Sequence, residues 1–149
     1  MQNSECGMQK FLFRGKKKSN GEWVEGYYTA IGGIANILVV AYDEKCDTPT
    51  HEYFKIQEVV PETVCLATFS TDKNGKRIFR GDILESRYDE KYPEDFCYEQ
   101  VLWDNNGFYM KEVGCSDLEP LDVSGCATYS KVVGNIYDNP ELLEERDDE

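Results

Sequence analysis

The sequence is poor in the residues from which metal and redox centres are usually built. His51 is its one histidine, and none of its six cysteines lies in a Cys-x-x-Cys pair. A closed zinc site needs four ligands, and Cys46 with His51 would supply only two of them. We therefore interpret segment 43–52 as a polar loop and predict no metal and no cofactor. Reduced thiols are expected at the six scattered positions, Cys6, Cys46, Cys65, Cys97, Cys115 and Cys126.

Long apolar segments are missing as well. The chain has no apolar run of about eighteen residues, the length that a membrane-crossing helix requires. Residues 1–7 lack the basic and then apolar layout of a signal peptide. We therefore expect a cytoplasmic protein with no membrane segment. The chain has 149 residues, 40% of them hydrophobic, which is enough to build a core without metals or disulfides.

Basic residues are scarce, with 16 lysines and arginines against 29 acids and a net charge of −13. This balance disfavours general nucleic-acid binding, because phosphates would be repelled. The basic residues gather in two segments, 10–18 and 73–80, whereas the acids gather in 82–104 and 138–149. The acidic segments are read either as solvated surface with a disordered tail, or as a face that docks a basic partner or mimics nucleic acid.

A catalytic motif is absent too. Cys46 and His51 have no recognisable third group to orient the base and no oxyanion site. The carboxylates are numerous but none is paired with a partner by a known spacing. We predict that the protein is not an enzyme and assign no catalytic residue.

What the sequence does contain is turns between short β-type segments. Asn-Gly pairs occur at 20–21, 74–75 and 106–107. Asn and Gly tolerate positive φ, which two-residue hairpin turns require, so each pair predicts a hairpin. The fold class is therefore predicted to be mainly β, with antiparallel hairpins. The strands are expected over residues 11–14, 22–28, 34–42, 53–60, 64–69, 82–88, 96–103, 108–111 and 127–133.

Two segments have distinct patterns of their own. Residues 34–42 form the most apolar run and predict a strand buried on both faces, either as a central strand or at a subunit interface of a homo-oligomer. Near the C-terminus, Asn139 and Pro140 predict a short helical turn with Asn139 as its cap. Between these, residues 112–125 predict a loop with at most one short helical turn.

The domain organisation follows from these segments. Residues 1–9 lack periodicity and are expected to be flexible. Residues 10–63 form an N-terminal β portion, because Pro61 is a plausible boundary. Residues 64–143 form a second β portion, and residues 144–149 are an acidic tail.

Taken in order, several segments resemble the YopX-like family of bacteriophage and prophage proteins. The segments are 11–16, 21–27, 60–64, 72–83, 101–104 with 107–108, and 133–142. The resemblance implies a phage-derived, mainly β protein whose later half is an SH3-like small barrel, and it transfers no reaction and no catalytic residue. Ser70 departs from the pattern, since the family has a glycine there, and the tail after Leu143 is an extension. The matching structural signature is Asn74, Gly75, Gly81, Asp82, Trp103, Gly107, Gly134 and Pro140, in which the glycines make turns and Trp103 with Phe108 supplies core aromatics.

Two functions are weighed on this basis. The first is a non-enzymatic protein-interaction module that engages an unknown host or phage protein in the bacterial cytoplasm. The second is a nucleic-acid-binding accessory protein that uses the basic hairpin tips at 16–18 and 73–80. The net charge favours the first.

Overall fold

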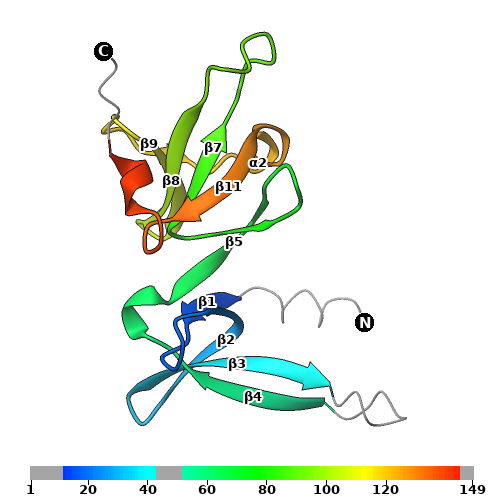
Figure 1. Ribbon diagram of the computed structural model, residues 1–149, viewed down its shortest axis with the longest axis vertical. Coiled ribbons are helices and arrows are strands. Elements are labelled where there is room, and N and C mark those ends of the chain that lie inside the picture. The colour runs from blue at the N-terminus through cyan, green and yellow to red at the C-terminus, as the bar shows by residue number, and fades with distance from the viewer. Residues whose placement is uncertain (1–11, 43–51, 145–149) are drawn as a thin grey trace. The chain divides into compact units, whose positions relative to one another are not determined.

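The strands of this protein form two antiparallel sheets, one of six strands and one of five, with a single short helix among the described residues. A computed structural model describes residues 12–42 and 52–144 (Figure 1). The prediction of a mainly β, antiparallel fold is confirmed. The chain divides into two compact units, Met1–Ala67 and Thr68–Glu149. This division lies inside a strand, whereas the predicted boundary between residues 63 and 64 lies just before it.

The first unit is a series of hairpins. Its strands are β1 (Phe13–Lys16), β2 (Trp23–Ile31), β3 (Ile34–Tyr42) and β4 (Glu52–Glu58), followed by the 3-10 turn η1 (Pro61–Thr63) and the start of β5 (Cys65–Thr71). Gly21 has φ +76 in the β1–β2 turn, as its Asn-Gly pair predicts. Gly32 and Gly33 both have positive φ and form a two-residue turn between the paired Ile31 and Ile34.

β3 is a central strand, since it pairs with β2 on one side and β4 on the other. This confirms one of the two alternatives for segment 34–42. The expected burial on both faces is wrong, because Ile37 is fully buried while Ile34 is 49% exposed. The pleat turns alternate residues to opposite faces, and one face carries the core of the unit. That core is formed by Ala35, Ile37 and Val59, with Phe13, Val24, Val39 and Val64 packed against it.

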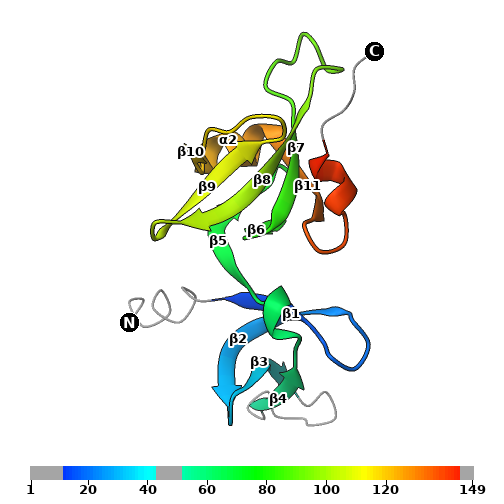
Figure 2. The same ribbon diagram turned by 90° about the vertical axis from the view of Figure 1, so that its left-hand side faces the viewer.

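The second unit contains the five-stranded sheet, in the order β10-β9-β8-β7-β11 (Figure 2). Its elements are the end of β5, β6 (Arg77–Phe79), β7 (Asp82–Ser86), β8 (Cys97–Asp104), β9 (Gly107–Glu112), β10 (Glu119–Pro120), α2 (Val123–Tyr129), β11 (Ser130–Asn135) and η2 (Pro140–Leu143). β10 and β11 are the edges of this sheet, and no ladder in the described part of the chain closes it into a barrel.

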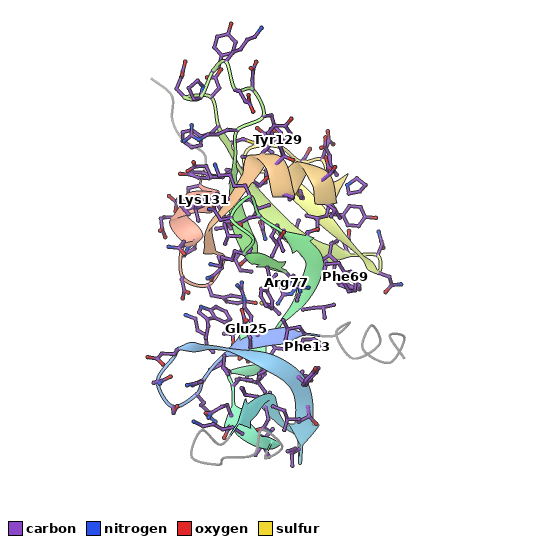
Figure 3. The ribbon with its side chains drawn as sticks, turned by 90° about the vertical axis from the view of Figure 1, so that its right-hand side faces the viewer. Phe13, Glu25, Phe69, Arg77, Tyr129 and Lys131 are labelled. Carbon is purple, nitrogen blue, oxygen red and sulfur yellow. The ribbon has the colours of Figure 1, made fainter. Side chains whose placement is uncertain are left out.

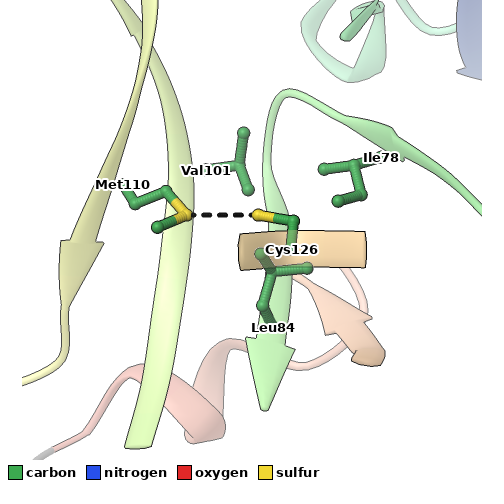
Figure 4. Packing of buried hydrophobic residues seen from close by; sticks show 5 residues of the cluster. All are labelled: Ile78, Leu84, Val101, Met110 and Cys126. Carbon is green, nitrogen blue, oxygen red and sulfur yellow. Dashed lines mark hydrogen bonds between the residues drawn. The ribbon is translucent and has the colours of Figure 1, made fainter. Parts of the chain in front are cut away.

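The core of the second unit lies between strands and helix. It consists of Ile78, Leu84, Val101, Met110 and Cys126, all at most 5% exposed (Figure 4). The Cys126 thiol donates to Met110 Sδ across 3.6 Å, so the sulfur atoms of α2 and β9 meet inside this cluster. Each large apolar side chain buried here contributes about 1.5–3 kcal/mol to folding.

Two of the three turns predicted from Asn-Gly pairs differ in the structure from the predicted two-residue turn. In the β8–β9 hairpin Asp104 pairs with Gly107, so the two turn residues are Asn105 and Asn106, with φ of 46° and 63°. Gly107 is thus a strand residue, and asparagine alone supplies the left-handed backbone. In loop 72–76 after β5 only Gly75 has positive φ, and the neighbouring Asn74 does not. The Asp72 backbone N–H donates to the Lys76 carbonyl at 2.8 Å, so three residues and not two lie within the turn.

The segment before the last strand was also predicted wrongly. Residues 123–129 form the helix α2, whereas a loop to residue 125 and a strand from residue 127 were expected. The N-cap Asp122 explains the helix, because its carboxylate accepts from the Gly125 backbone N–H at 3.1 Å. At the C-terminal turn the helical start at Pro140 is confirmed, but Asn139 makes no side-chain cap bond there. Its Oδ1 instead accepts from the Asn135 backbone N–H at 3.2 Å.

Trp103 is not a core residue. It is 44% exposed, and its ring meets that of its cross-strand partner Phe108 edge to face, with centroids 4.8 Å apart. Trp103 lies next to the hairpin turn, one residue before Asp104, and is not part of the core cluster. Phe108 is partly buried and packs against that cluster, as predicted. Among the described residues, no helix has the length and apolar character that a membrane crossing requires.

Candidate functional site

The second unit has a cleft where β7 ends and β8 begins. It has a volume of about 380 Å³. The residues around it are three carboxylates, two aromatic rings, a hydroxyl and a thiol, namely Ser86, Tyr88, Asp89, Glu94, Asp95, Phe96 and Cys97. We call this feature the acid-aromatic cleft.

Strand pairing positions the base of this cleft. Ser86 and Cys97 are direct partners in the β7–β8 ladder, so the chain leaves and re-enters the sheet at the same level. The Ser86 and Ser130 hydroxyls share a buried hydrogen bond of 2.7 Å, which ties β7 to β11 at this end. The floor of the cleft is therefore part of the sheet and not of a loop.

The connecting segment 87–96 forms the rest of the wall. Arg87 donates from Nη2 to Glu85 Oε1 at 2.9 Å and from Nη1 to the Pro93 carbonyl. Its guanidinium also lies 4.7 Å from the centroid of the Phe96 ring. Arg87 thus binds three parts of this region together, and the charge it carries is already matched by Glu85.

Tyr88 lines the cleft, and two contacts hold its side chain in place. Its hydroxyl donates to Glu99 Oε1 at 2.7 Å, and its ring lies 5.6 Å from that of Tyr129. Tyr129 is the last residue of α2 (Figure 3). The side chain is nevertheless 48% exposed, whereas Glu99 is 7% exposed. Tyr88 therefore presents one ring surface to solvent while its hydroxyl is fixed.

The pKa values of the Tyr88 phenol and of the Cys97 and Cys126 thiols are raised, so these groups favour their protonated forms. Burial, together with the nearby Glu99 and Glu112 carboxylates, raises the pKa of the Cys97 thiol to about 12. Burial likewise raises the pKa of Cys126 to about 11. Burial and the hydrogen bond to Glu99 raise the pKa of the Tyr88 phenol. Since the thiolate is the reactive form of cysteine, these thiols are weak nucleophiles at neutral pH.

A second surface lies on the first unit. The register places Tyr27, Leu38 and Ile56 side by side across β2, β3 and β4, and places Ile31 beside Ile34 on the same face. Ile31, Ile34 and Ile56 are 50%, 49% and 54% exposed. We call these five residues the apolar face. It is the side of the sheet opposite Ile37 and the core of the unit.

The basic residues that were weighed for nucleic-acid binding lie in different units. Lys18 pairs with Glu58 at 3.1 Å in the first unit. In the second, Arg77 donates to the Thr68 carbonyl and Arg80 to the Tyr137 hydroxyl, each at 3.1 Å. Internal contacts therefore engage several of these cations.

The predicted signature residues fall into two groups. Gly81, Asp82 and Gly134 come together where β7 pairs with β11, and the Ile136 backbone N–H donates to the Gly81 carbonyl at 2.9 Å. A side chain at Gly134 would collide with Asn139, the neighbour of Pro140. Asn74, Gly75, Trp103 and Gly107 lie at two hairpin ends away from this junction. These residues organise the fold, and none of them lines the acid-aromatic cleft.

The cleft itself was missed by sequence reasoning. By its sequence, segment 89–95 is a charged connector, too polar and too broken by Pro93 to be core. A signal was present, because Tyr88, Tyr92 and Phe96 alternate with the acids of that segment. Cys46 and His51 lie outside the described residues. Within residues 12–42 and 52–144 there is no group of three or more His, Cys, Asp or Glu side chains placed to hold a metal ion.

Ser70, the departure from the expected glycine, is a buried residue of β5. Its φ is not positive. The strand therefore accepts a serine without backbone strain.

The chain matches one known protein family and is similar to a solved structure. The family described as YopX protein matches residues 12–144. Among solved structures, the crystal structure of protein EF1440 from Enterococcus faecalis is similar, with a TM-score of 0.57 and 22% identity, covering 90% of this chain and 98% of that one. At this identity the likeness shows a shared fold alone. No curated protein matches the chain.

Proposed function

Since the chain belongs to the YopX family, we propose that it is a non-enzymatic protein-interaction module, made by a phage or prophage, that engages a host or phage protein in the bacterial cytoplasm. The proposal concerns binding only. Its partner is a protein and not a small molecule, because the surface that motivates it is a sheet face and not an enclosed pocket.

The apolar face is the observation that carries this proposal. Three isoleucines, each about half exposed, share one side of the sheet with Tyr27 and Leu38. Single exposed apolar residues are common, but several gathered on one face are typical of interaction surfaces. Covering three such side chains with a partner would contribute several kcal/mol, at roughly 25 cal/mol per Å² of apolar surface.

We also propose that the second unit is an SH3-like small barrel. The support is its meander of short antiparallel strands, β7 to β9, with a short helix before the last strand β11 beside β7. Small barrels of this kind commonly carry binding surfaces in the loops between their strands.

The test uses a charge placed on the apolar face. Tagged wild-type protein is used to capture partners from a bacterial lysate, and cross-linking mass spectrometry locates the contact. Ile34→Asp should abolish capture, because a carboxylate there would be buried without a partner. Ala30→Asp is the matched control, since Ala30 is exposed on the other face of the neighbouring strand. Capture that survives Ile34→Asp, or that is lost equally in the control, would count against the proposal.

Light scattering tests whether the partner is a second copy of this chain. If the captured partner is a second copy of this chain, the wild type is a homo-oligomer and Ile34→Asp is a monomer. A monomeric wild type leaves a different protein as the partner.

Nucleic-acid binding is the alternative, and one contact favours it. Arg14 and Lys16 lie 4.6 and 5.4 Å from the centroid of the Trp23 ring, which groups two cations with an aromatic side chain on one sheet face. A gel shift with single- and double-stranded DNA at low salt tests it. Retardation that falls steeply with salt would support this alternative, whereas unshifted DNA would remove it.

A further inference from the structure

We propose that the acid-aromatic cleft receives an arginine side chain from an extended segment of the partner protein. This inference rests on the proposed function and adds to it a second contact surface and the chemistry of the segment that the surface takes. An arginine fits because it combines an apolar stem, a flat cation and a fork of donors.

The aromatic rings supply the first element of the fit. Tyr88 is half exposed, and its ring is fixed by the hydrogen bond to Glu99 and by the contact with Tyr129. A rigid exposed ring is a good platform, because little conformational freedom is lost when a cation stacks on it. Phe96 shows that a ring in this cleft accommodates a guanidinium, since Arg87 of the same chain lies 4.7 Å from its centroid.

The carboxylates supply the second element. Asp89, Glu94 and Asp95 are exposed around the rings, and the seven lining residues, all in the described part of the chain, include no basic side chain. Arg87 lies close by, but its charge is paired with Glu85 at 2.9 Å. The rim therefore keeps a net negative charge, which attracts a cation and repels a phosphate or a second carboxylate.

The size of the cleft supplies the third element. A volume of about 380 Å³ lies at the lower end of the range of roughly 300–1,000 Å³ that ligand pockets span. This suits one long side chain with its flanking backbone. Lysine would fit less well, because its ammonium is a compact charge that cannot lie flat on a ring and reach two carboxylates together.

The probe is a fluorescein-labelled Gly-Ser peptide that carries two arginines. Its matched control carries citrulline at both positions, which keeps the shape and removes the charge. Fluorescence anisotropy measures affinity, and amide chemical shifts of the intact protein locate the contact. We expect the arginine peptide to bind, to weaken about tenfold as salt rises from about 0.05 to 0.5 M, and to shift resonances of Tyr88 and Phe96. The citrulline peptide should bind at least about fivefold more weakly.

Two protein variants test the site. Glu94→Gln with Asp95→Asn removes two charges from the cleft, and Asp117→Asn with Glu119→Gln removes two exposed charges elsewhere in the same unit. The first should weaken the arginine peptide about fivefold or more, and the second should leave it within about twofold. Circular dichroism of both variants checks that they fold.

Three results would overturn the inference: equal binding of the citrulline peptide, equal weakening in both double variants, or shifts that avoid the cleft. Its failure can be told from failure of the proposed function. If the arginine peptide does not bind while capture by the wild type remains sensitive to Ile34→Asp, the inference is wrong and the interaction module stands. If no partner is captured but the peptide binds as described, the cleft does take an arginine and the proposed interaction module is not supported.

Discussion

Asp72 is the residue whose removal tests the architecture of the second unit most sharply. Its side chain is 3% exposed and accepts three backbone hydrogen bonds of 2.9 Å. Oδ1 accepts from the Asn74 and Lys76 N–H groups, and Oδ2 accepts from Val132 in β11. One carboxylate thus shapes the turn before β6 and fastens it to a strand far along the chain.

The loss of folding stability expected on removing the Asp72 carboxylate follows from these hydrogen bonds. Hydrogen bonds to a charged group contribute about 1.5–3 kcal/mol each, but three bonds to one group are not additive. Asp72→Ala leaves three backbone donors without the acceptor they use, so we expect a loss of about 3–5 kcal/mol. Asp72→Asn keeps one oxygen acceptor but turns its NH₂ group toward a backbone N–H donor. It should lower the free energy of unfolding by about 2 kcal/mol.

The pH dependence gives an independent check. Burial alone would raise the pKa of Asp72, but the hydrogen bonds from the Val132, Lys76 and Asn74 backbones hold it below the usual value of 3.8. A carboxyl with a lowered folded-state pKa stabilises the fold above its unfolded pKa, and this contribution is lost as pH falls through the folded value. The stability gap between wild type and Asp72→Asn should therefore be constant above about pH 5 and shrink below about pH 4.

Urea unfolding followed by tryptophan fluorescence measures this gap. The chain has two tryptophans, Trp23 in the first unit and Trp103 in the second. A Trp23→Phe background makes Trp103 the reporter of the second unit alone. A gap of less than about 1 kcal/mol at pH 7, or a gap that does not narrow in acid, would refute the role given to Asp72.

Three further predictions concern backbone and thiol chemistry. Gly81→Ala should cost about 1–2 kcal/mol in a urea melt, because φ is +87 and the new Cβ would lie 3.4 Å from Ile136 Cγ1; an unchanged midpoint would contradict the turn geometry. Asn106→Gly should stabilise the β8–β9 hairpin by about 0.5–1 kcal/mol, because φ is 63° there; a loss of stability would show that the Asn106 side chain matters more than its backbone. The pKa of Cys97 is raised to about 12, so its thiol should react with iodoacetamide at pH 7.5 at least about tenfold more slowly than in the urea-unfolded chain. Mass spectrometry of the labelled peptide measures this rate. Equal rates in the folded and unfolded chains would mean that the thiol is not shielded.

The hairpins could be predicted from the sequence because their turn chemistry is local. Asn20 with Gly21 predicts a turn that the structure contains, and Gly32 with Gly33 marks another. The β8–β9 turn shows the limit of this reasoning. Asn105, Asn106 and Gly107 all tolerate left-handed backbone, so composition alone does not choose the two residues that turn, and cross-strand pairing decides it.

The helix α2 and the cleft were missed because their signals are not local. Gly125 reads as a helix breaker, yet it sits in the first turn of α2, where Asp122 caps its N–H and a side chain would collide with that carboxylate. The acidic connector 89–95 reads as solvated loop. Only the pairing of Ser86 with Cys97 reveals that both ends of this connector meet at the end of the sheet, where its residues line a cleft together with the exposed Tyr88.

The central claim is that the apolar face of the first unit contacts a protein partner. Hydrogen exchange of the protein, alone and with the partner captured from lysate, tests it directly. Because a partner seated on this face excludes water from it, we predict slowed exchange over β2, β3 and the described part of β4 around Ile56, and no such slowing in Ile34→Asp. Unchanged exchange in these strands, with slowing confined to other parts of the chain, would contradict the claim.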